Sequence, residues 1–539
     1  MHRRALLLTL ALAGRGLADA APESTVFHNL AIPGNYTGSL RPQIHFSPPQ
    51  HFMNDPNGLH LAADGTYHLY YQYDPTDIVA GNQHWGHATS KDLYHWENQP
   101  IAIFPDHPGD GIFSGSAVID VNNTSGFFPN QKDGVVAIYT LNTPLEETQE
   151  IAYSRDGGYT FTKYANNPVI SINSTQFRDP KVIWYGPTNS WVMVVSYAQD
   201  FTIGIWTSPN LTDWTHASNF THAGLLGLQY ECPNLVSMPM NGTDEPMWVL
   251  AISINPGAPQ GGSITTYFPG DFNGTHFAPV DGAARITDYG KDNYAGQFFF
   301  GIPEGQDAVS IAWASNWQYS QLVPTGPLEN WRSAMALPRT NSLANISRLG
   351  YDLISKPYKL ETLFDKPLVQ NDSFANGSQL VDYTQAPWGT IYFQMNVTGI
   401  PAANQTGTAN FTFLSSTSQE SLSGGFFIGG DFWINRGRIN GFDNPFFTDK
   451  FSITNLIAPS GDWSMEGVID QSILEVFLNG GQQAATTTFF SVAPLDTMRI
   501  ATDGLNPGVN VSIAVWSLKS AWAAQATNGT VLGHNVTLA

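Results

Sequence analysis

The sequence has little cysteine and little charge, and each shortage narrows what the protein can be. One cysteine, Cys232, occurs in 539 residues, so an intrachain disulfide cannot form. Only 12% of the residues are charged, which argues against a disordered chain. Lys and Arg number 23 against 44 Asp and Glu, and the net charge is −21. Nucleic acid and anionic membranes are therefore unfavourable partners, because their phosphates would be repelled.

Long apolar runs and helical repeats are also scarce. Beyond the N-terminus no stretch approaches the about 20 apolar residues that a transmembrane helix needs, so we expect no membrane insertion. Aromatic residues make up 13% of the chain and glycine occurs 50 times. Short alternating segments separated by turns dominate, which is typical of an all-β protein. The length predicts two or three domains.

The N-terminus carries a targeting pattern. Arg3 and Arg4 precede an apolar run over 5–13, and Ala-Asp-Ala at 18–20 is a small-x-small cleavage site. The pattern predicts a secretory signal peptide over residues 1–20. Asn-x-Ser/Thr sequons are dense, which predicts a secreted, N-glycosylated protein. They include Asn35, Asn123, Asn173, Asn210, Asn219, Asn273, Asn396, Asn410, Asn510 and Asn535.

A weak repeat runs through the first part of the chain. A strand end, a polar turn and a closing aromatic recur roughly every 55–65 residues, in "ATSKDLYHW", "AYSRDGGYTF", "WTSPNLTDW" and "FPGDFNGTHF". The cluster at 313–317, "WASNW", marks a fifth unit. Units of this size indicate propeller blades, although the same motif is common in hairpins generally. We therefore predict a β-propeller over 21–346, a linker over 347–364 and a second all-β domain, a β-sandwich, over 365–539.

Polar residues recur in phase with these units: Asp55, Ser114, Asp179 and Glu231. The first strand of each propeller blade lines the axis, so we expect these side chains to converge on one central pocket. Asp55 lies in "NDPNG", which is a strong turn signal and could be only that. The convergence suggests instead that the turn holds the Asp55 carboxylate in place.

Acetal hydrolysis at an anomeric carbon needs two carboxyl groups, one that attacks and one that protonates the departing oxygen. Asp55, which we expect to accept turn N–H bonds and to stay ionised, suits the nucleophile. Glu231, beside apolar neighbours, suits the acid/base. Asp179 follows Arg178, which we expect to neutralise it so that it accepts bonds from sugar hydroxyls. Three aromatic side chains suit the apolar face of a sugar: Trp85, Phe113 and Trp317.

These motifs also carry a resemblance. "FMNDPNG", "FRDPK" and "YECP", together with "YQYDP", "WGHA" and "FSGS", resemble glycoside hydrolase family 32 over nearly the whole chain. The chain is most similar to the secreted fungal invertases, the β-fructofuranosidases. The resemblance implies a five-bladed β-propeller followed by a C-terminal β-sandwich. It also implies retention of configuration through a covalent fructosyl–enzyme intermediate, without a metal or a cofactor.

The resemblance assigns roles residue by residue. Asp55 matches the nucleophile, Glu231 the acid/base and Asp179 the transition-state stabiliser. The fructose subsite is matched by Asn54, Gln72, Trp85, Phe113, Ser114 and Arg178, and we add Phe52 and Trp317 as substrate-binding residues.

Two positions depart from the family pattern. Many members have Trp where this chain has Phe52, and many have Gly or Asp where it has Asn234. Both positions are expected near the leaving-group side, where they would affect whether water or sugar accepts the fructosyl group. Cys232 is expected to point away from Glu231, because neighbours on a strand alternate faces. Its predicted role is packing.

The sequence thus predicts a β-fructofuranosidase that hydrolyses sucrose and short β-fructosides, with fructosyl transfer at high sucrose. Exo-inulinase or levanase action and sucrose fructosyl transfer remain alternatives within the same class. An inactive fructan- or sucrose-binding protein is an alternative from another class, and loss of Asp55 or Glu231 would have indicated it. Whether the chain forms a homo-oligomer stays open.

Overall fold

The computed structural model describes residues 30–374 and 376–522. The predicted signal peptide and the Asn535 sequon lie outside these ranges. Strands dominate, as predicted. The described part of the chain contains one short α-helix, α1 (Thr325–Glu329), and 3₁₀ turns at Gly186–Thr188, Ala198–Asp200, Leu360–Leu363, Pro387–Gly389 and Asn479–Gly481.

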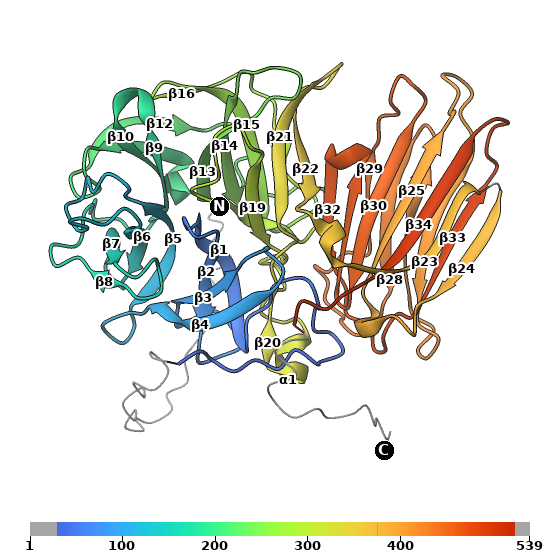
Figure 1. The fold of residues 1–539 in the computed structure, drawn as a ribbon, viewed down its shortest axis with the longest axis horizontal. Coiled ribbons are helices and arrows are strands. Elements are labelled where there is room, and N and C mark those ends of the chain that lie inside the picture. Colours follow the sequence, from blue (N-terminus) through green and yellow to red (C-terminus); the bar gives the residue numbers. More distant parts are fainter. Residues whose placement is uncertain (1–29, 375, 523–539) are drawn as a thin grey trace, which may run out of the picture.

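Five sheets are arranged around a common centre in the first two thirds of the chain (Figure 1). The first holds β1 (His51–Leu61), β2 (Tyr67–Asp74), β3 (His84–Ser90) and β4 (Trp96–Ile103). The second holds β5 (Gly111–Ile119), β6 (Val135–Asn142), β7 (Glu147–Ser154) and β8 (Thr162–Lys163). The third holds β9 (Phe177–Tyr185), β10 (Ser190–Tyr197), β11 (Thr202–Ser208) and β12 (Thr215–Thr221).

The remaining two sheets complete the ring. The fourth holds β13 (Tyr230–Met238), β14 (Met247–Ile254), β15 (Ile264–Phe272), β16 (Phe277–Pro279) and β17 (Arg285–Ile286). The fifth holds β18 (Tyr294–Phe298), β19 (Ala308–Trp313), β21 (Arg339–Ile346) and β22 (Gly350–Pro357). The first strands contact one another in the order β1, β5, β9, β13, β18 and back to β1. This is a five-bladed β-propeller, and the predicted fold class is confirmed.

The ring is closed by late segments that hold the first strand. β20 (Trp331–Arg332) pairs in parallel with β1 at His51 and Phe52. The backbone N–H of Leu61 donates to the carbonyl of Phe300 at 2.8 Å. Gln297 on β18 donates from Nε2 to the carbonyl of Pro56 at 3.1 Å. The strand that carries Asp55 therefore depends on residues from the fifth blade.

A β-sandwich forms the last third of the described chain. One six-stranded sheet holds β23 (Phe364–Phe374), β34 (Asn510–Leu518), β25 (Ile391–Thr398), β30 (Trp463–Asp470), β31 (Ile473–Leu478) and β32 (Gln483–Thr488). The other holds β24 (Gly377–Asp382), β33 (Thr497–Asp503), β26 (Thr408–Leu414), β27 (Ser421–Phe427), β28 (Asp431–Arg438) and β29 (Lys450–Thr454).

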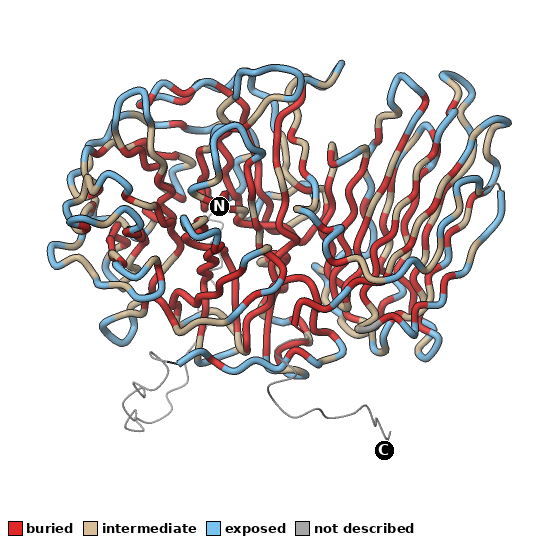
Figure 2. Tube along the Cα trace, viewed as in Figure 1, coloured by how far each residue is buried: buried red, intermediate tan, exposed pale blue. Residues whose placement is uncertain are grey.

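Burial distinguishes the two parts (Figure 2). The propeller strand β1 is buried along nearly its whole length, because neighbouring blades cover both of its faces. The sandwich strand β26 alternates between buried and partly exposed residues, as expected for a sheet with one face on a core. The core between the two sandwich sheets includes Phe393, Phe411 and Met465, and Phe426 stacks on Trp463 with ring centroids 4.3 Å apart.

The predicted linker over 347–364 contains regular structure. β22 pairs with β21 along all of its eight residues and is the outer strand of the fifth blade. The predicted linker thus begins too early, because residues 350–357, "GYDLISKP", form a strand of the fifth blade. We propose a domain boundary near Tyr358, between β22 and the 3₁₀ turn Leu360–Leu363.

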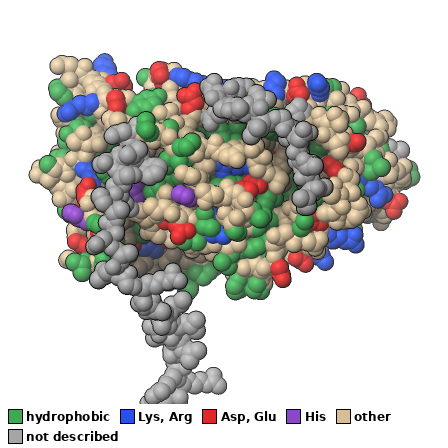
Figure 3. All heavy atoms as spheres, turned by 90° about the horizontal axis from the view of Figure 1, so that it is seen from below, with side chains coloured by type: hydrophobic (Ala, Val, Ile, Leu, Met, Phe, Trp, Pro, Cys, Tyr) green, Lys and Arg blue, Asp and Glu red, His purple; other side chains and the backbone are tan. Residues whose placement is uncertain are grey.

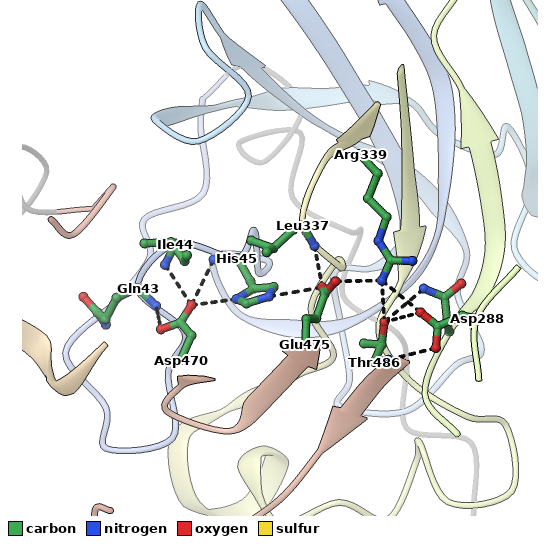
Figure 4. Close-up of polar contacts among 10 residues, drawn as sticks. Gln43, Ile44, His45, Asp288, Leu337, Arg339, Asp470, Glu475 and Thr486 are labelled. Carbon is green, nitrogen blue, oxygen red and sulfur yellow. Dashed lines mark hydrogen bonds and ion pairs between the residues drawn. The ribbon is translucent and has the colours of Figure 1, made fainter. Parts of the chain in front are cut away.

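A buried polar network joins the two domains (Figure 4). Asp470 on β30 accepts bonds from the backbone N–H groups of Gln43 and Ile44, at 2.7 and 2.9 Å. His45 lies between Asp470 and Glu475, with ring nitrogens 2.7 and 3.3 Å from their carboxylates. Burial alone would lower the pKa of His45, but these two carboxylates raise it to about 9. The histidine is therefore held as a cation in the interface.

The same network continues into the fifth blade. Arg339 on β21 donates from Nη2 to Glu475 at 2.7 Å and to Asp288 at 2.9 Å. Asp288 also accepts a bond from the hydroxyl of Thr486 on β32 at 2.8 Å. Each buried charge thus has an opposite partner, which limits the cost of removing it from water.

The surface is mixed in charge. On the face shown in Figure 3 acidic and basic side chains are interspersed among uncharged ones. Within the described ranges, no helix is long and apolar enough to cross a membrane.

Candidate active site

The "NDPNG" stretch is part of a strand, and the turn prediction was wrong. All of its residues belong to β1, which pairs with β2 on both sides of the stretch. The pairing register shifts between Met53 and Pro56 and again between Asn57 and His60. Gly58 has φ +55, and a Cβ there would lie 2.5 Å from the Tyr70 ring. Pro and Gly therefore produce bulges within a strand rather than its reversal.

The inner strand of every other blade also has a shift in its pairing register, near the residue that contributes to the site. Register shifts fall between Phe113 and Gly115 on β5, between Glu231 and Asn234 on β13, and between Tyr294 and Gln297 on β18. On β9 the shift lies opposite Asp179, which has φ +66. Bulges re-aim side chains that strict alternation would place on one face or the other. Five bulges at one level bring the polar side chains of all five inner strands together.

Asp55 is buried, with 8% of its surface exposed. Its Oδ2 accepts a hydrogen bond from the Ser114 hydroxyl at 2.8 Å and lies 3.4 Å from Sγ of Cys232. Its Oδ1 has no hydrogen-bond partner. Burial raises the pKa of Asp55 to about 6, with a further contribution from Glu231, while the Ser114 bond opposes the rise. The predicted turn N–H donors are absent here; a side-chain hydroxyl from the second blade takes their place.

Cys232 points toward the carboxylates, contrary to the prediction. The bulge on β13 gives Cys232 φ +46 and breaks the alternation on which that prediction relied. Its backbone N–H donates to Oδ2 of Asp179 at 2.9 Å, and its Sγ lies 3.5 Å from the same oxygen. Burial and three neighbouring carboxyl groups raise the pKa of the thiol well above its ordinary value. Cys232 thus contacts both Asp55 and Asp179 as a neutral donor.

Asp179 is held by backbone and hydroxyl groups. Its own N–H donates to Oγ1 of Thr140 at 3.1 Å, which fixes the bulge. Burial and the neighbouring Glu231 raise the pKa of Asp179, and Arg178 opposes the rise. This carboxyl group is therefore a candidate to share or carry a proton in the unliganded site.

Arg178 makes its ion pairs with Glu231 and Glu147, not with Asp179 as predicted. Its Nε and Nη2 both donate to Oε1 of Glu231, at 3.1 and 3.0 Å. Its Nη1 lies 3.2 Å from both carboxylate oxygens of Glu147 on β7. Although burial lowers it, the charges of Glu231, Asp179 and Glu147 together raise the pKa of Arg178. The guanidinium is a fixed positive charge shared by two acids.

Glu147 and Tyr294 were not found from the sequence. The hydroxyl of Tyr294, the first residue of β18, donates to Oε2 of Glu231. Tyr294 follows Glu231 by 63 residues, within the repeat period, so spacing alone could have found it. The prediction instead placed the fifth unit at Trp313–Trp317, where β19 ends. Glu147 begins β7, the third strand of its blade, and no pattern in the sequence points to it.

Amide side chains form a second group between the first two blades. Gln83 donates from Nε2 to Oδ1 of Asn54 at 2.9 Å and to Oε1 of Gln72 at 3.1 Å. Gln72 in turn donates to the carbonyl of Ile112 at 3.0 Å. All three side chains are buried. The structure thus brings Asn54 and Gln72 together, through a residue that sequence reasoning missed.

The predicted aromatic wall is divided. Phe113 and Trp317 are partly exposed, whereas Trp85 and Phe52 are fully buried. The indole N–H of Trp85 donates to the carbonyl of Phe113 at 3.0 Å. Phe52 packs on Trp317, with ring centroids 6.2 Å apart. Only Phe113 and Trp317 therefore present ring surface, and the other two support them from behind.

Asn234 is also a supporting residue. It is buried and ties β13 to β18, donating to the carbonyl of Gly296 at 3.1 Å and accepting from the N–H of Phe298 at 3.2 Å. The bulge turns its side chain between two blades, and its place near the leaving-group side stays a prediction. Within the described ranges no three His, Cys, Asp or Glu side chains form a group able to hold a metal ion.

Two family descriptions match nearly all of the described chain. The Glycosyl hydrolases family 32 N-terminal domain matches residues 45–357, and the Glycosyl hydrolases family 32 C terminal matches residues 359–517. The chain belongs to glycoside hydrolase family 32. The resemblance seen in the sequence motifs is confirmed, and the protein is a glycoside hydrolase.

Several curated proteins are similar to this chain. The extracellular exo-inulinase of Meyerozyma guilliermondii is 45% identical over 470 residues, which cover 84% of this chain and 90% of that protein. The invertase of Schizosaccharomyces pombe is 41% identical over 531 residues, which cover 93% of this chain and 90% of that protein.

Solved structures are also similar to this chain. The fructofuranosidase of Schwanniomyces occidentalis complexed with fructose has a TM-score of 0.83 and 38% identity, covering 90% of this chain and 99% of that chain. The exo-inulinase of Aspergillus awamori has a TM-score of 0.83 and 33% identity, covering 90% and 100%.

Proposed function

We propose that the protein is a retaining β-fructofuranosidase that hydrolyses sucrose and short β-fructosides. The observation that carries this proposal is the meeting of three carboxyl groups from three inner strands, the buried Asp55 and Asp179 and the partly exposed Glu231, which are linked by Cys232 and Arg178. Two carboxyl groups with different surroundings are what double displacement at an anomeric carbon requires. The similarity to fungal invertases supports sucrose as the substrate.

In the first step Asp55 attacks C2 of the fructosyl unit, and Glu231 protonates the departing glycosidic oxygen. The C2–O bond to glucose breaks as the Asp55–C2 bond forms. Arg178 and Tyr294 both donate to Glu231 and stabilise the carboxylate that remains after it has given its proton. In the second step this carboxylate takes a proton from water, which attacks C2 and frees Asp55.

The remaining residues have binding roles in this proposal. Asp179, positioned by the N–H of Cys232, accepts bonds from furanose hydroxyls. Asn54, Gln72, Ser114 and Arg178 supply further polar contacts, and Phe113 and Trp317 supply apolar surface. Trp85 and Phe52 act through these two aromatic residues.

Exo-inulinase action is the second candidate, because a relative 45% identical is an extracellular exo-inulinase. The word "extracellular" in the names of such relatives also supports secretion, in agreement with the predicted signal peptide. N-glycosylation at the predicted sequons would require secretion. Fructosyl transfer would use the same intermediate, with a sugar in place of water.

Product analysis over time on sucrose, 1-kestose and inulin tests the proposal. Glucose and fructose in equal amounts from sucrose, with slower release from inulin, is the expected result. Faster release from inulin would favour exo-inulinase, and excess glucose with kestoses would favour a transferase. No release of fructose from any of the three would overturn the proposal.

A further inference from the structure

The propeller segment 288–294 lies along strand β32 of the sandwich. The N–H of Tyr289 donates to the carbonyl of Ala484 at 2.7 Å, and the N–H of Asp292 donates to the carbonyl of Thr486 at 3.2 Å. In return the N–H of Thr486 donates to Oδ1 of Asp288 at 2.8 Å. Figure 4 shows this end of the contact, where Asp288, Thr486 and Arg339 meet. The segment is thus fixed to the second domain through its backbone.

Asp292 is the fully buried charge at the other end of this contact. Its Oδ2 lies 3.0 Å from Nη1 of Arg436 on β28 and accepts the N–H of Thr488 at 2.8 Å. Its Oδ1 accepts the hydroxyl of Tyr319. Arg436 is equally buried and also donates to the carbonyls of Thr448 and Thr488, at 2.9 and 2.6 Å. One arginine of the sandwich therefore fixes a propeller carboxylate in a single orientation.

Two short paths lead from this ion pair to the candidate active site. Asp292 precedes Tyr294 by two residues, and the Tyr294 hydroxyl donates to Glu231. Tyr319 follows Trp317 by two residues, and Trp317 is one of the two partly exposed aromatic side chains of the site. Asn316 joins the two paths, because its Nδ2 donates to the carbonyl of Lys291 at 2.8 Å.

We propose that Arg436 is a positioning residue for the acid/base step: through Asp292 it holds Tyr294 against Glu231, and through Tyr319 it holds the Trp317 backbone. This role rests on the proposed function. An O–H donor is directional, and the hydrogen bond weakens steeply when its angle falls. Small displacements of Tyr294 would therefore remove support from Glu231 without opening the fold, and small misplacements near reacting groups cost rate. Through Arg436 the sandwich domain thus helps to position groups of the candidate active site.

The test compares two substrates. Sucrose needs a protonated leaving group, whereas a β-fructofuranoside of 4-nitrophenol needs little protonation, so a defect in acid catalysis lowers the rate on sucrose selectively. Glu231→Gln supplies the benchmark for such a selective loss. Tyr319→Phe and Asp292→Asn remove the proposed support, and Tyr319→Phe keeps the ring that packs on Phe447.

Asp470→Asn is the matched control, because Asp470 belongs to the same domain interface but contacts the segment 43–45. It should lower the melting temperature while leaving the ratio of the two rates unchanged. Arg436→Lys and Arg436→Gln complete the series, since lysine keeps the charge opposite Asp292 and glutamine does not.

We expect Tyr319→Phe and Asp292→Asn to lower kcat on sucrose by about 5- to 50-fold, with kcat on the nitrophenyl substrate within about 2-fold of wild type. Arg436→Lys should retain more sucrose activity than Arg436→Gln. If folded Tyr319→Phe lost equal activity on both substrates, or lost none, the positioning role would be overturned. The proposed function would stand in that case, provided that the wild-type protein is active. A wild-type protein inactive on both substrates would overturn both.

Discussion

The thiol of Cys232 lies 3.4 Å from Oδ2 of Asp55, in a chain that has no other cysteine. Because burial raises the pKa of this thiol, it stays protonated and can donate weakly to the carboxylate. We expect iodoacetamide at pH 8 to leave the folded protein unlabelled and to label it fully in denaturant, measured by mass spectrometry. Rapid labelling of the folded protein would contradict a protonated, buried thiol.

Asp55→Asn should abolish turnover and leave the fold intact. The amide cannot form the covalent bond to C2, so kcat should fall on the order of 10⁴-fold or more, as when other nucleophiles are removed. Thermal melting should stay close to wild type. Asp64→Asn is the control, because Asp64 lies in the exposed turn after β1 and should leave activity unchanged. Ordinary activity in Asp55→Asn would exclude the nucleophilic role.

The acid limb of the pH profile should report Asp55. The pKa of this carboxyl group is raised to about 6, so kcat/KM should fall as the pH drops below that value and Asp55 gains a proton. The Ser114 bond lowers this pKa, and Ser114→Ala should therefore move the acid limb to higher pH. A limb that moved to lower pH, or stayed in place, would show that the bond does not control Asp55.

His45 should make the stability of the domain interface depend on pH. Its pKa is about 9 in the folded protein, above the ordinary value of 6.5. The resulting stabilisation, about 3 kcal/mol, is fully present below pH 6.5 and is lost as the pH rises through 9. Melting temperatures from pH 6 to 10 should therefore fall more steeply for wild type than for His45→Gln. Parallel curves would contradict a charged His45.

The repeat predicted the ring, and with it the meeting of Asp55, Ser114, Asp179 and Glu231, because spacing alone determines which residues occupy equivalent inner strands. What the sequence could not show was the direction of individual side chains. Cys232 and Asp179 adopt left-handed φ values that non-glycine residues seldom take, and only the surrounding blades impose them.

The sequence also failed to predict which residues distant along the chain form ion pairs. Arg178 was assigned to the adjacent Asp179, but the guanidinium reaches Glu147, 31 positions earlier, and Glu231, 53 positions later. Nothing in the local sequence distinguishes Glu147 from a surface carboxylate, and the motif around Glu231 predicted an acid/base but not a partner of Arg178. Which distant carboxylates share one arginine depends on how the blades pack against one another. Composition and motif spacing do not give that packing.

The parallel pairing of β20 with β1 has a consequence for when, during synthesis, the protein can become active. Asp55 lies on β1, the first strand of the described chain, yet that strand is held by Gln297, 241 positions beyond Pro56, and by β20 at 331–332. During synthesis Asp55, the proposed nucleophile, therefore emerges long before the residues that position it. We therefore expect a chain that ends before residue 331 to contain Asp55, Asp179 and Glu231 and yet to cleave no sucrose, because β20 and its pairing with β1 would be missing.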